Sequence, residues 1–295
     1  VKLVVVTGCL GFIGMHVTKA CLKRGWRVYG IDKSTYAANG IEDLFDMCEN
    51  SSLTNFTFVE EDICKLKDIP NCDYIINVAA ETHVGNSIID SSDFIRSNIT
   101  GVKNILDIIR RKPSNVARKP ILFHFSTDEV YGDISKGSFT EESPLSPSNP
   151  YSASRTYGID YLILRPANNY GNYQYPEKLI PLVVKLLQQH KKIRLHDEGE
   201  PYRSWLHAED TAQAVITIIE SGVINEIFNI EGGFEQKNKD TVRKIVNSYF
   251  NGSYASEYKD INKLLDLSYQ REGQDVRYSV DDSKLRKLGW KPEKI

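Results

Sequence analysis

The chain has 295 residues, of which 41% are hydrophobic and 26% charged, a composition typical of an ordinary soluble globular protein. Its net charge of −2 gives no general attraction to nucleic acid or to an anionic membrane. No apolar run approaches the roughly 20 residues that span a bilayer, and the first residues do not resemble a signal peptide. The cysteines and histidines show no metal-ligand spacing, so we expect reduced thiols, no metal site and a cytoplasmic location.

Short β-branched runs alternate with helical patterns up to about residue 170, which is typical of βαβ units and a parallel sheet. In chain order we expect strands at Leu3–Val6, Arg27–Ile31, Phe56–Val59, Tyr74–Val78, Ile121–Phe125 and Tyr161–Leu164, with helices at residues 12–24, 92–111 and 178–190. Sparser elements follow, namely strands Lys192–Leu195 and Ile227–Ile230 and helices Ala208–Glu220 and Lys239–Phe250.

This pattern predicts an α/β fold with two regions. A doubly wound Rossmann sheet in residues 1–170 binds a dinucleotide, and a smaller C-terminal α/β region in residues 171–295 binds the substrate. Whether some later strands and helices return to the Rossmann domain is left open.

One stretch does not fit this rhythm. Tyr151 follows Asn149-Pro150 and is expected to open a helix, yet nine residues separate it from the strand at Tyr161. A crossover between parallel strands needs about a dozen residues or more, usually as a helix. Either the topology breaks here or a piece of chain is missing.

Three glycines lie between the first strand and the first helix, in Thr7-Gly8-Cys9-Leu10-Gly11-Phe12-Ile13-Gly14. Such glycines allow a tight turn and let the backbone approach a pyrophosphate at the helix N-terminus. Asp32 ends the second strand, where a carboxylate accepts hydrogen bonds from the adenosine ribose and repels a 2′-phosphate. We therefore expect NAD rather than NADP, although Lys33 next door could tolerate the phosphate. The predicted ligands are Gly8, Gly11, Phe12, Ile13, Gly14 and Asp32.

The next two strand ends complete the predicted cofactor site. Asp62 and Ile63 follow the third strand and are expected near the adenine. Ala79 and Ala80 follow the fourth strand and are small enough to let the cofactor pass. Ordinary strand-end packing explains the two alanines equally well.

The fifth strand ends in an unusual polar run, Ser126-Thr127-Asp128-Glu129-Val130-Tyr131-Gly132. Ligands of open α/β sheets bind at the carboxyl ends of the strands, so this run should face one. Two adjacent carboxylates each disfavour the ionisation of the other. The alternative interpretation is a solvated loop with a helix cap.

These motifs, in this order, resemble the extended short-chain dehydrogenase/reductase family, and within it the nucleotide-sugar 4,6-dehydratases. The likeness covers nearly the whole chain, and the subfamily rests on the pair Asp128-Glu129. Sugar 4-epimerases of the family usually carry small residues there, and the decarboxylases that make xylose usually keep only the Glu. The similar segments are Thr7–Gly14, Phe125–Gly132 and residues 79–84, 150–154, 168–171, 176–181 and 203–206.

The resemblance implies a role for each catalytic residue. Tyr151, as phenolate, takes the proton of the sugar C4 hydroxyl while NAD+ takes the hydride, and Thr127 holds that hydroxyl. Glu129 then removes the C5 proton and Asp128 protonates the leaving C6 hydroxyl, after which the hydride returns to C6. The resemblance also places Asn98, Ser126 and Tyr151 beside the cofactor.

One position departs from the family pattern. The family carries a Lys four residues after the Tyr, where it lowers the pKa of the phenol, whereas this chain has Arg155. The family reads Ser-Ala-Ser-Lys, then a length of helix, then Arg-Thr-Tyr-Gly, but here Ser154 runs straight into Arg155. We infer that the Lys and its helix are missing between these two residues, and that Arg155 is not a substitute.

The resemblance further implies a sugar-nucleotide site. Its two arginines suit a pyrophosphate because a guanidinium binds two oxygens at once. Gln274 stands where the family usually has His, and Gly85-Asn86 replaces a usual Asp-Arg, which leaves the substrate open between a dTDP-, UDP- or other NDP-hexose. The implied residues are His83, Asn169, Glu177, Lys178, Leu179, Arg203, Asn238, Arg271 and Tyr278.

The related enzymes pair two helices of each subunit in a four-helix bundle, which predicts a homodimer here. Helix 92–111 is one of the two, and it carries Ile95, Ile99, Val102, Leu106 and Ile109 at a spacing that buries one face against the sheet. Two other functions remain open. One is a sugar 4-epimerase or another oxidoreductase of the family, and the other is a regulator that keeps NAD only as a ligand.

Overall fold

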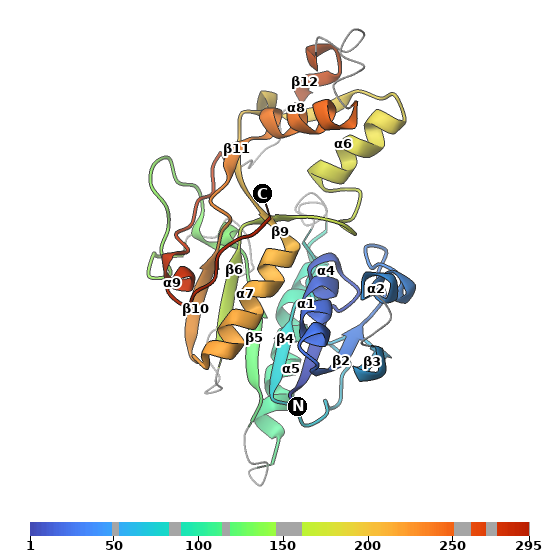
Figure 1. Ribbon diagram of the computed structural model, residues 1–295, viewed down its shortest axis with the longest axis vertical. Helices are drawn as coiled ribbons and strands as arrows, with labels where there is room; N and C mark the ends of the chain where they lie inside the picture. The colour runs from blue at the N-terminus through green and yellow to red at the C-terminus, as the bar shows by residue number, and fades with distance from the viewer. Residues whose placement is uncertain are drawn as a thin grey trace.

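The computed structural model describes residues 1–48, 53–82, 90–113, 119–145, 161–250, 261–269 and 276–294. Its centre is a seven-stranded sheet in the order β10-β6-β5-β4-β1-β2-β3, with every neighbouring pair parallel (Figure 1). The strands are β1 (Leu3–Thr7), β2 (Arg27–Asp32), β3 (Phe56–Glu60), β4 (Tyr74–Asn77), β5 (Ile121–Phe125), β6 (Tyr161–Pro166) and β10 (Glu226–Ile230). The predicted doubly wound sheet is confirmed.

The alternation of side chains along β1 decides which helices cover each face of the sheet. Val4 and Val6 pack in one core with α1 (Phe12–Lys23) and α7 (Ala208–Ser221), whereas Val5 packs in a second core with α5 (Val102–Arg111). Because both faces of the inner strands are buried, β1, β4 and β5 are apolar runs without an exposed side. The short α2 (Ile41–Met47) follows β2.

A smaller region lies beyond the carboxyl edge of the large sheet (Figure 1). Here α6 (Leu179–Gln188) and α8 (Asn238–Tyr249) share a separate core with the parallel pair β8 (Ile193–His196) and β12 (Leu265–Tyr269). A three-stranded sheet of β7 (Asn168–Tyr170), β9 (Tyr202–His207) and β11 (Glu235–Lys237) connects this region to the Rossmann sheet. Later in the chain α7 and β10 return to the large sheet, and α9 (Ser283–Arg286) packs on β10.

The helix expected over residues 92–111 is interrupted. It begins as α4 (Ser92–Ile95), passes through the π-helical turn η2 (Arg96–Gly101) and continues as α5. At the end of this turn a Cβ on Gly101 would lie 2.4 Å from Ile63 Cδ1, so the helix approaches the loop after β3 very closely. Val102, Leu106 and Ile109 are buried as predicted, but Ile95 is 45% exposed and does not join the core.

β6 lies beside β5 and parallel to it, so the expected crossover connects them within residues 126–160. Tyr151 and the junction of Ser154 with Arg155 lie outside the described residues. No helix in the part of the chain described here is long and apolar enough to cross a membrane.

Candidate active site

The turn between β1 and α1 leaves no room for a side chain at Gly8 or Gly14. Gly8 has φ +69°, and a Cβ there would lie 2.7 Å from the amide nitrogen of Ala79. A Cβ on Gly14 would lie 1.8 Å from the carbonyl oxygen of Gly8. Gly11 caps α1, whose first turn carries no acidic residue, so unpaired N–H groups and the positive end of the helix dipole face the pocket. These residues fit a dinucleotide pyrophosphate, and Gly8, Gly11, Phe12, Ile13 and Gly14 all line the pocket.

Asp32 lies at the end of β2 on the wall of the same pocket and is 7% exposed. Its two carboxylate oxygens accept hydrogen bonds from the backbone N–H groups of Leu10 at 3.0 Å and Ser34 at 2.9 Å. Each oxygen keeps a lone pair for a further donor. The carboxylate therefore anchors the glycine-rich turn and stands where the sequence predicts the ribose.

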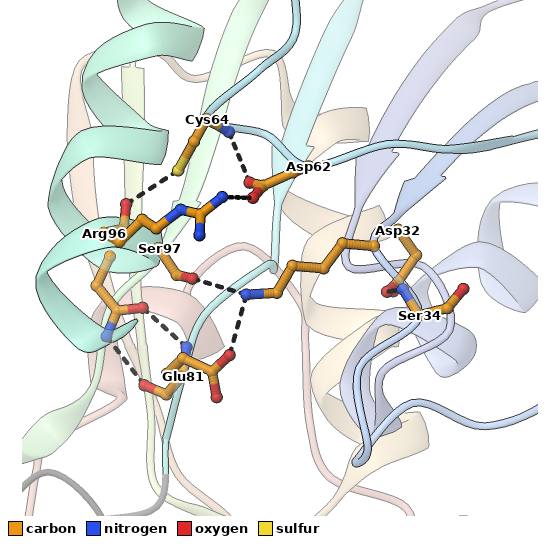
Figure 2. Close-up of polar contacts among 9 residues, drawn as sticks. Asp32, Ser34, Asp62, Cys64, Glu81, Arg96 and Ser97 are labelled. Carbon is orange, nitrogen blue, oxygen red and sulfur yellow. Dashed lines mark hydrogen bonds and ion pairs between the residues drawn. The ribbon is translucent and has the colours of Figure 1, made fainter. Parts of the chain in front are cut away.

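The other predicted cofactor residues divide into two groups. Ile63, Ala79 and Ala80 line the pocket. Asp62 and Asn98 are engaged with protein groups beside it (Figure 2). Their direct contact with the cofactor, like that of Ser126 at the end of β5, stays a prediction.

Asp62 accepts hydrogen bonds from the Arg96 guanidinium at 2.6 Å and from the amide of Cys64 at 2.9 Å. Burial opposes ionisation, but these bonds and the charge of Arg96 hold the pKa of Asp62 below its usual value. Asn98 donates to the carbonyl oxygen of Glu81 at 2.9 Å and accepts from its N–H at 2.8 Å. Both side chains thus fix the backbone that surrounds the cofactor pocket.

The polar run after β5 folds into the 3-10 turn η3 (Asp128–Tyr131). Thr127 caps this turn, because its hydroxyl oxygen accepts a hydrogen bond from the N–H of Glu129 at 3.3 Å and donates to an oxygen of Asp128 at 3.3 Å. Asp128 is 4% exposed, whereas Glu129 is only partly buried. The alternative of a solvated loop is therefore wrong for Asp128.

Burial raises the pKa of Asp128 to about 7, and the neighbouring carboxylate of Glu129 adds to the rise. The hydrogen bond from Thr127 and the charge of Arg203 oppose it. A carboxyl group with this pKa is partly protonated at neutral pH and can donate a proton. The two adjacent carboxyl groups therefore differ in their surroundings, which suits one acid and one base.

Arg203 approaches the catalytic edge from β9 in the smaller region. Its guanidinium lies over the ring of Tyr278, 4.9 Å from the ring centre, and donates to the carbonyl oxygen of Tyr202 at 2.6 Å. Tyr278 is buried. Arg203 and Tyr278, predicted to bind substrate, are thus brought together near Asp128.

The remaining predicted substrate residues are more scattered. Glu177 and Lys178 line the dinucleotide pocket, and Lys178 donates to the carbonyl oxygen of Thr82 at 3.1 Å. Leu179 packs against the core of the smaller region. The Asn169 amide bonds to the Ala167 carbonyl and the Thr211 hydroxyl, which ties β7 to α7.

Asn238 begins α8, and its side-chain oxygen is buried with no hydrogen-bond partner among the described residues. His83 and Arg271 lie outside the described residues, like Tyr151. Substrate contact by any of these residues stays a prediction. Within the described residues no cluster of His, Cys, Asp or Glu could hold a metal ion.

Sequence reasoning missed a buried polar network beneath η3. Arg165 of β6 is 2% exposed, lies 4.7 Å from the centre of the Tyr131 ring and donates to the Tyr131 hydroxyl. That hydroxyl donates in turn to Asn229 of β10 at 2.9 Å. The network joins two strands, β6 and β10, to the turn that carries Asp128 and Glu129. One charged residue inside an otherwise apolar strand, Tyr161–Pro166, was the signal for it.

Comparisons with known proteins agree with this geometry. The sequence family described as GDP-mannose 4,6 dehydratase matches residues 5–294. The dTDP-glucose 4,6-dehydratase of Haemophilus influenzae is 36% identical over 318 aligned positions, which cover 98% of this chain and 93% of that enzyme. The Escherichia coli enzyme of the same name is 35% identical over 326 positions, which cover 98% of this chain and 89% of the relative.

Solved structures give the same result. The dTDP-glucose 4,6-dehydratase of Streptomyces venezuelae, with NAD bound, superimposes with a TM-score of 0.85 at 32% identity and covers 99% of this chain and 92% of its own. A UDP-glucuronic acid 4-epimerase from Bacillus cereus has a TM-score of 0.84 at 22% identity, covers 99% of this chain and 95% of its own, and shares the fold alone. This chain therefore belongs to the nucleotide-sugar dehydratases of the extended short-chain dehydrogenase/reductase family.

Those alignments also bear on the unusual junction. The 318 and 326 aligned positions exceed the 295 residues of this chain, so the relatives contain residues that have no counterpart here. This agrees with a missing segment, although its location between Ser154 and Arg155 stays a prediction.

Proposed function

We propose that this protein is a nucleotide-sugar 4,6-dehydratase that converts an NDP-hexose to the NDP-4-keto-6-deoxyhexose. The observation that carries the proposal is the pair of adjacent carboxyl groups at the end of β5, with Asp128 buried and its pKa raised to about 7 beside the more exposed Glu129. The names of the relatives favour dTDP-glucose as the substrate.

Removal of water across C5 and C6 needs an acid and a base on the protein. Asp128 is partly protonated near pH 7 and, in its protonated form, gives the proton to the leaving C6 hydroxyl, while Glu129 takes the proton from C5. Thr127 holds the C4 hydroxyl, and it already holds η3 in place through its hydrogen bonds. Tyr151, outside the described residues, is proposed to take the proton of that hydroxyl.

The C5 proton becomes acidic only when C4 is a ketone. NAD, when bound, supplies a hydride acceptor at C4 and returns the hydride to C6, so no external redox partner is needed. The glycine-rich turn, Asp32, Ile63 and Ala79 would hold it, because they line one pocket at the carboxyl edge of the sheet.

Substrate binding is proposed to involve the smaller region. Arg203 lies near the catalytic turn, since its charge acts on Asp128, and Tyr278 lies under its guanidinium. The predicted contacts of His83, Asn169, Glu177, Lys178, Leu179, Asn238 and Arg271 belong to the same proposal.

The assembly and location are proposed on separate grounds. The exposed Ile95 at the start of helix 92–111 supports a homodimer through this helix, which light scattering would reject by reporting a monomer. All five cysteines are free thiols, and burial raises the pKa of each, which suits a reducing cytoplasm.

The test is incubation with a panel of NDP-hexoses followed by mass spectrometry. We expect the loss of one water from at least one member of the panel, dTDP-glucose first. Asp128→Asn serves as the matched variant, because it keeps the size of the side chain and removes the proton donor. A product of unchanged mass with inverted C4 would instead establish a 4-epimerase, and an absence of turnover with NAD bound would favour a regulator.

A further inference from the structure

Lys33 lines the dinucleotide pocket one residue after Asp32. A cation at this place favours an adenosine 2′-phosphate, and so favours NADP. Its ammonium is bound to protein groups instead, because Nζ lies 3.2 Å from Glu81 Oε1 and donates to the hydroxyl of Ser97 at 3.0 Å (Figure 2). The side chains of Lys33 and Glu81 are 31% and 19% exposed, so solvent screens this ion pair only in part.

The backbone of Glu81 is held independently of Lys33. Asn98 bonds to both its N–H and its carbonyl oxygen, and Ser97 beside Asn98 bonds Lys33. Both residues belong to the π-helical turn η2, which breaks an otherwise α-helical segment. Such turns are frequent at functional sites, and this one directs two consecutive side chains at the rim of the cofactor pocket.

Asp32 repels a 2′-phosphate, but its carboxylate is also engaged with the protein. Its oxygens accept hydrogen bonds from two backbone amides, and the cation Lys33 lines the pocket beside it. Glu81 supplies a negative charge that offsets the positive charge of Lys33, since it lines the same pocket and pairs with Lys33.

We infer that Glu81, positioned by the η2 turn, neutralises Lys33 and thereby determines the preference of this protein for NAD over NADP. The inference rests on the proposed use of NAD and assigns a specificity role to a residue outside the glycine-rich motif. With Glu81 in place, the Lys33 ammonium is directed at Glu81 and Ser97. Without the carboxylate it becomes a donor for a 2′-phosphate, with a charge-assisted hydrogen bond.

The experiment is calorimetric titration of cofactor-stripped protein with NAD and with NADP, which gives the ratio of the two dissociation constants. Glu81→Gln should shift that ratio toward NADP by about tenfold, the effect of one charge-assisted contact. The double variant with Lys33→Met should return the ratio to that of the wild type, because the new phosphate donor is then gone.

Glu61→Gln is the matched control, because Glu61 is a carboxylate of the same pocket that accepts a hydrogen bond from the amide of Asp62. Its ratio should stay that of the wild type. The inference is overturned if Glu81→Gln leaves the ratio unchanged, if Glu61→Gln shifts it equally, or if the gain survives the loss of Lys33. Because the measurement is binding, any of these outcomes leaves the loss of water from the NDP-hexose untouched.

Discussion

Replacement of Asp128 by Asn should stabilise the folded protein increasingly as the pH rises. Burial raises the pKa of Asp128 from 3.8 to about 7, and three units correspond to about 4 kcal/mol. The folded chain holds this proton more tightly than the unfolded chain. The free energy of unfolding of the wild type therefore falls as the pH rises from 3.8 to about 7, and the loss is complete above pH 7. Asn keeps the oxygen that accepts from Thr127 but has no charge to bury.

The stability of Asp128→Asn relative to wild type should therefore increase by about 2.5 kcal/mol from pH 5 to pH 8. Urea unfolding of both proteins at several pH values, followed by fluorescence, measures this difference. Asp281→Asn is the control, because hydrogen bonds from Ser283 hold the pKa of Asp281 below its usual value, and it stays ionised throughout this range. If the difference in the free energy of unfolding between Asp128→Asn and the wild type stayed constant or fell as the pH rises, the conclusion that burial raises the pKa of Asp128 would be refuted.

Three other substitutions test separate parts of the site. Glu129→Gln should block the exchange of the C5 hydrogen with deuterated solvent, observed by NMR, and exchange at the native rate would exclude Glu129 as the base. Gly14→Ala should abolish NAD binding in a titration, because the added methyl would lie 1.8 Å from the Gly8 carbonyl oxygen. The control Gly40→Ala should bind NAD normally, because its methyl would meet only the flexible tip of Glu42, at 3.0 Å. Tyr131→Phe should lower the free energy of unfolding by about 1–3 kcal/mol, since the Arg165 guanidinium and the side-chain oxygen of Asn229 both lose the buried hydroxyl that they share. A loss below that range in urea unfolding would show that the network contributes little.

Local sterics and periodicity made the Rossmann half predictable. At Gly8 and Gly14 a Cβ would clash with the backbone of Ala79 or with the Gly8 carbonyl oxygen, and at Gly11 it would be a tight contact with that oxygen. The spacing of the motif already contains this requirement. The sequence also shows apolar runs at the strands and helical spacing at α1. Together these patterns fit a parallel sheet whose two faces are covered by helices. Thr127, Asp128 and Glu129 could be assigned to the carboxyl edge because β5 ends just before them.

The direction of each polar side chain depended on residues far away in the sequence. Glu81 pairs with Lys33 across 48 positions, Tyr131 bonds Asn229 across 98, and Asn169 turns to Thr211 across 42. The short polar strands β7, β9 and β11 show no apolar period of their own, and they form because they pair with one another over the catalytic edge.

The π-helical turn η2 was equally hidden. The sequence of helix 92–111 has ordinary helical spacing, and the close approach of Gly101 to Ile63 becomes evident only when the helix is packed against the loop after β3. The sequence by itself determined the strands, the glycine cradle and the carboxylate pair, because apolar periodicity, glycine spacing and the residues at a strand end are local features of the sequence. The tertiary structure decided which charges meet and which carboxyl group is buried, because hydrogen bonds and desolvation act between groups that only the folded chain brings together.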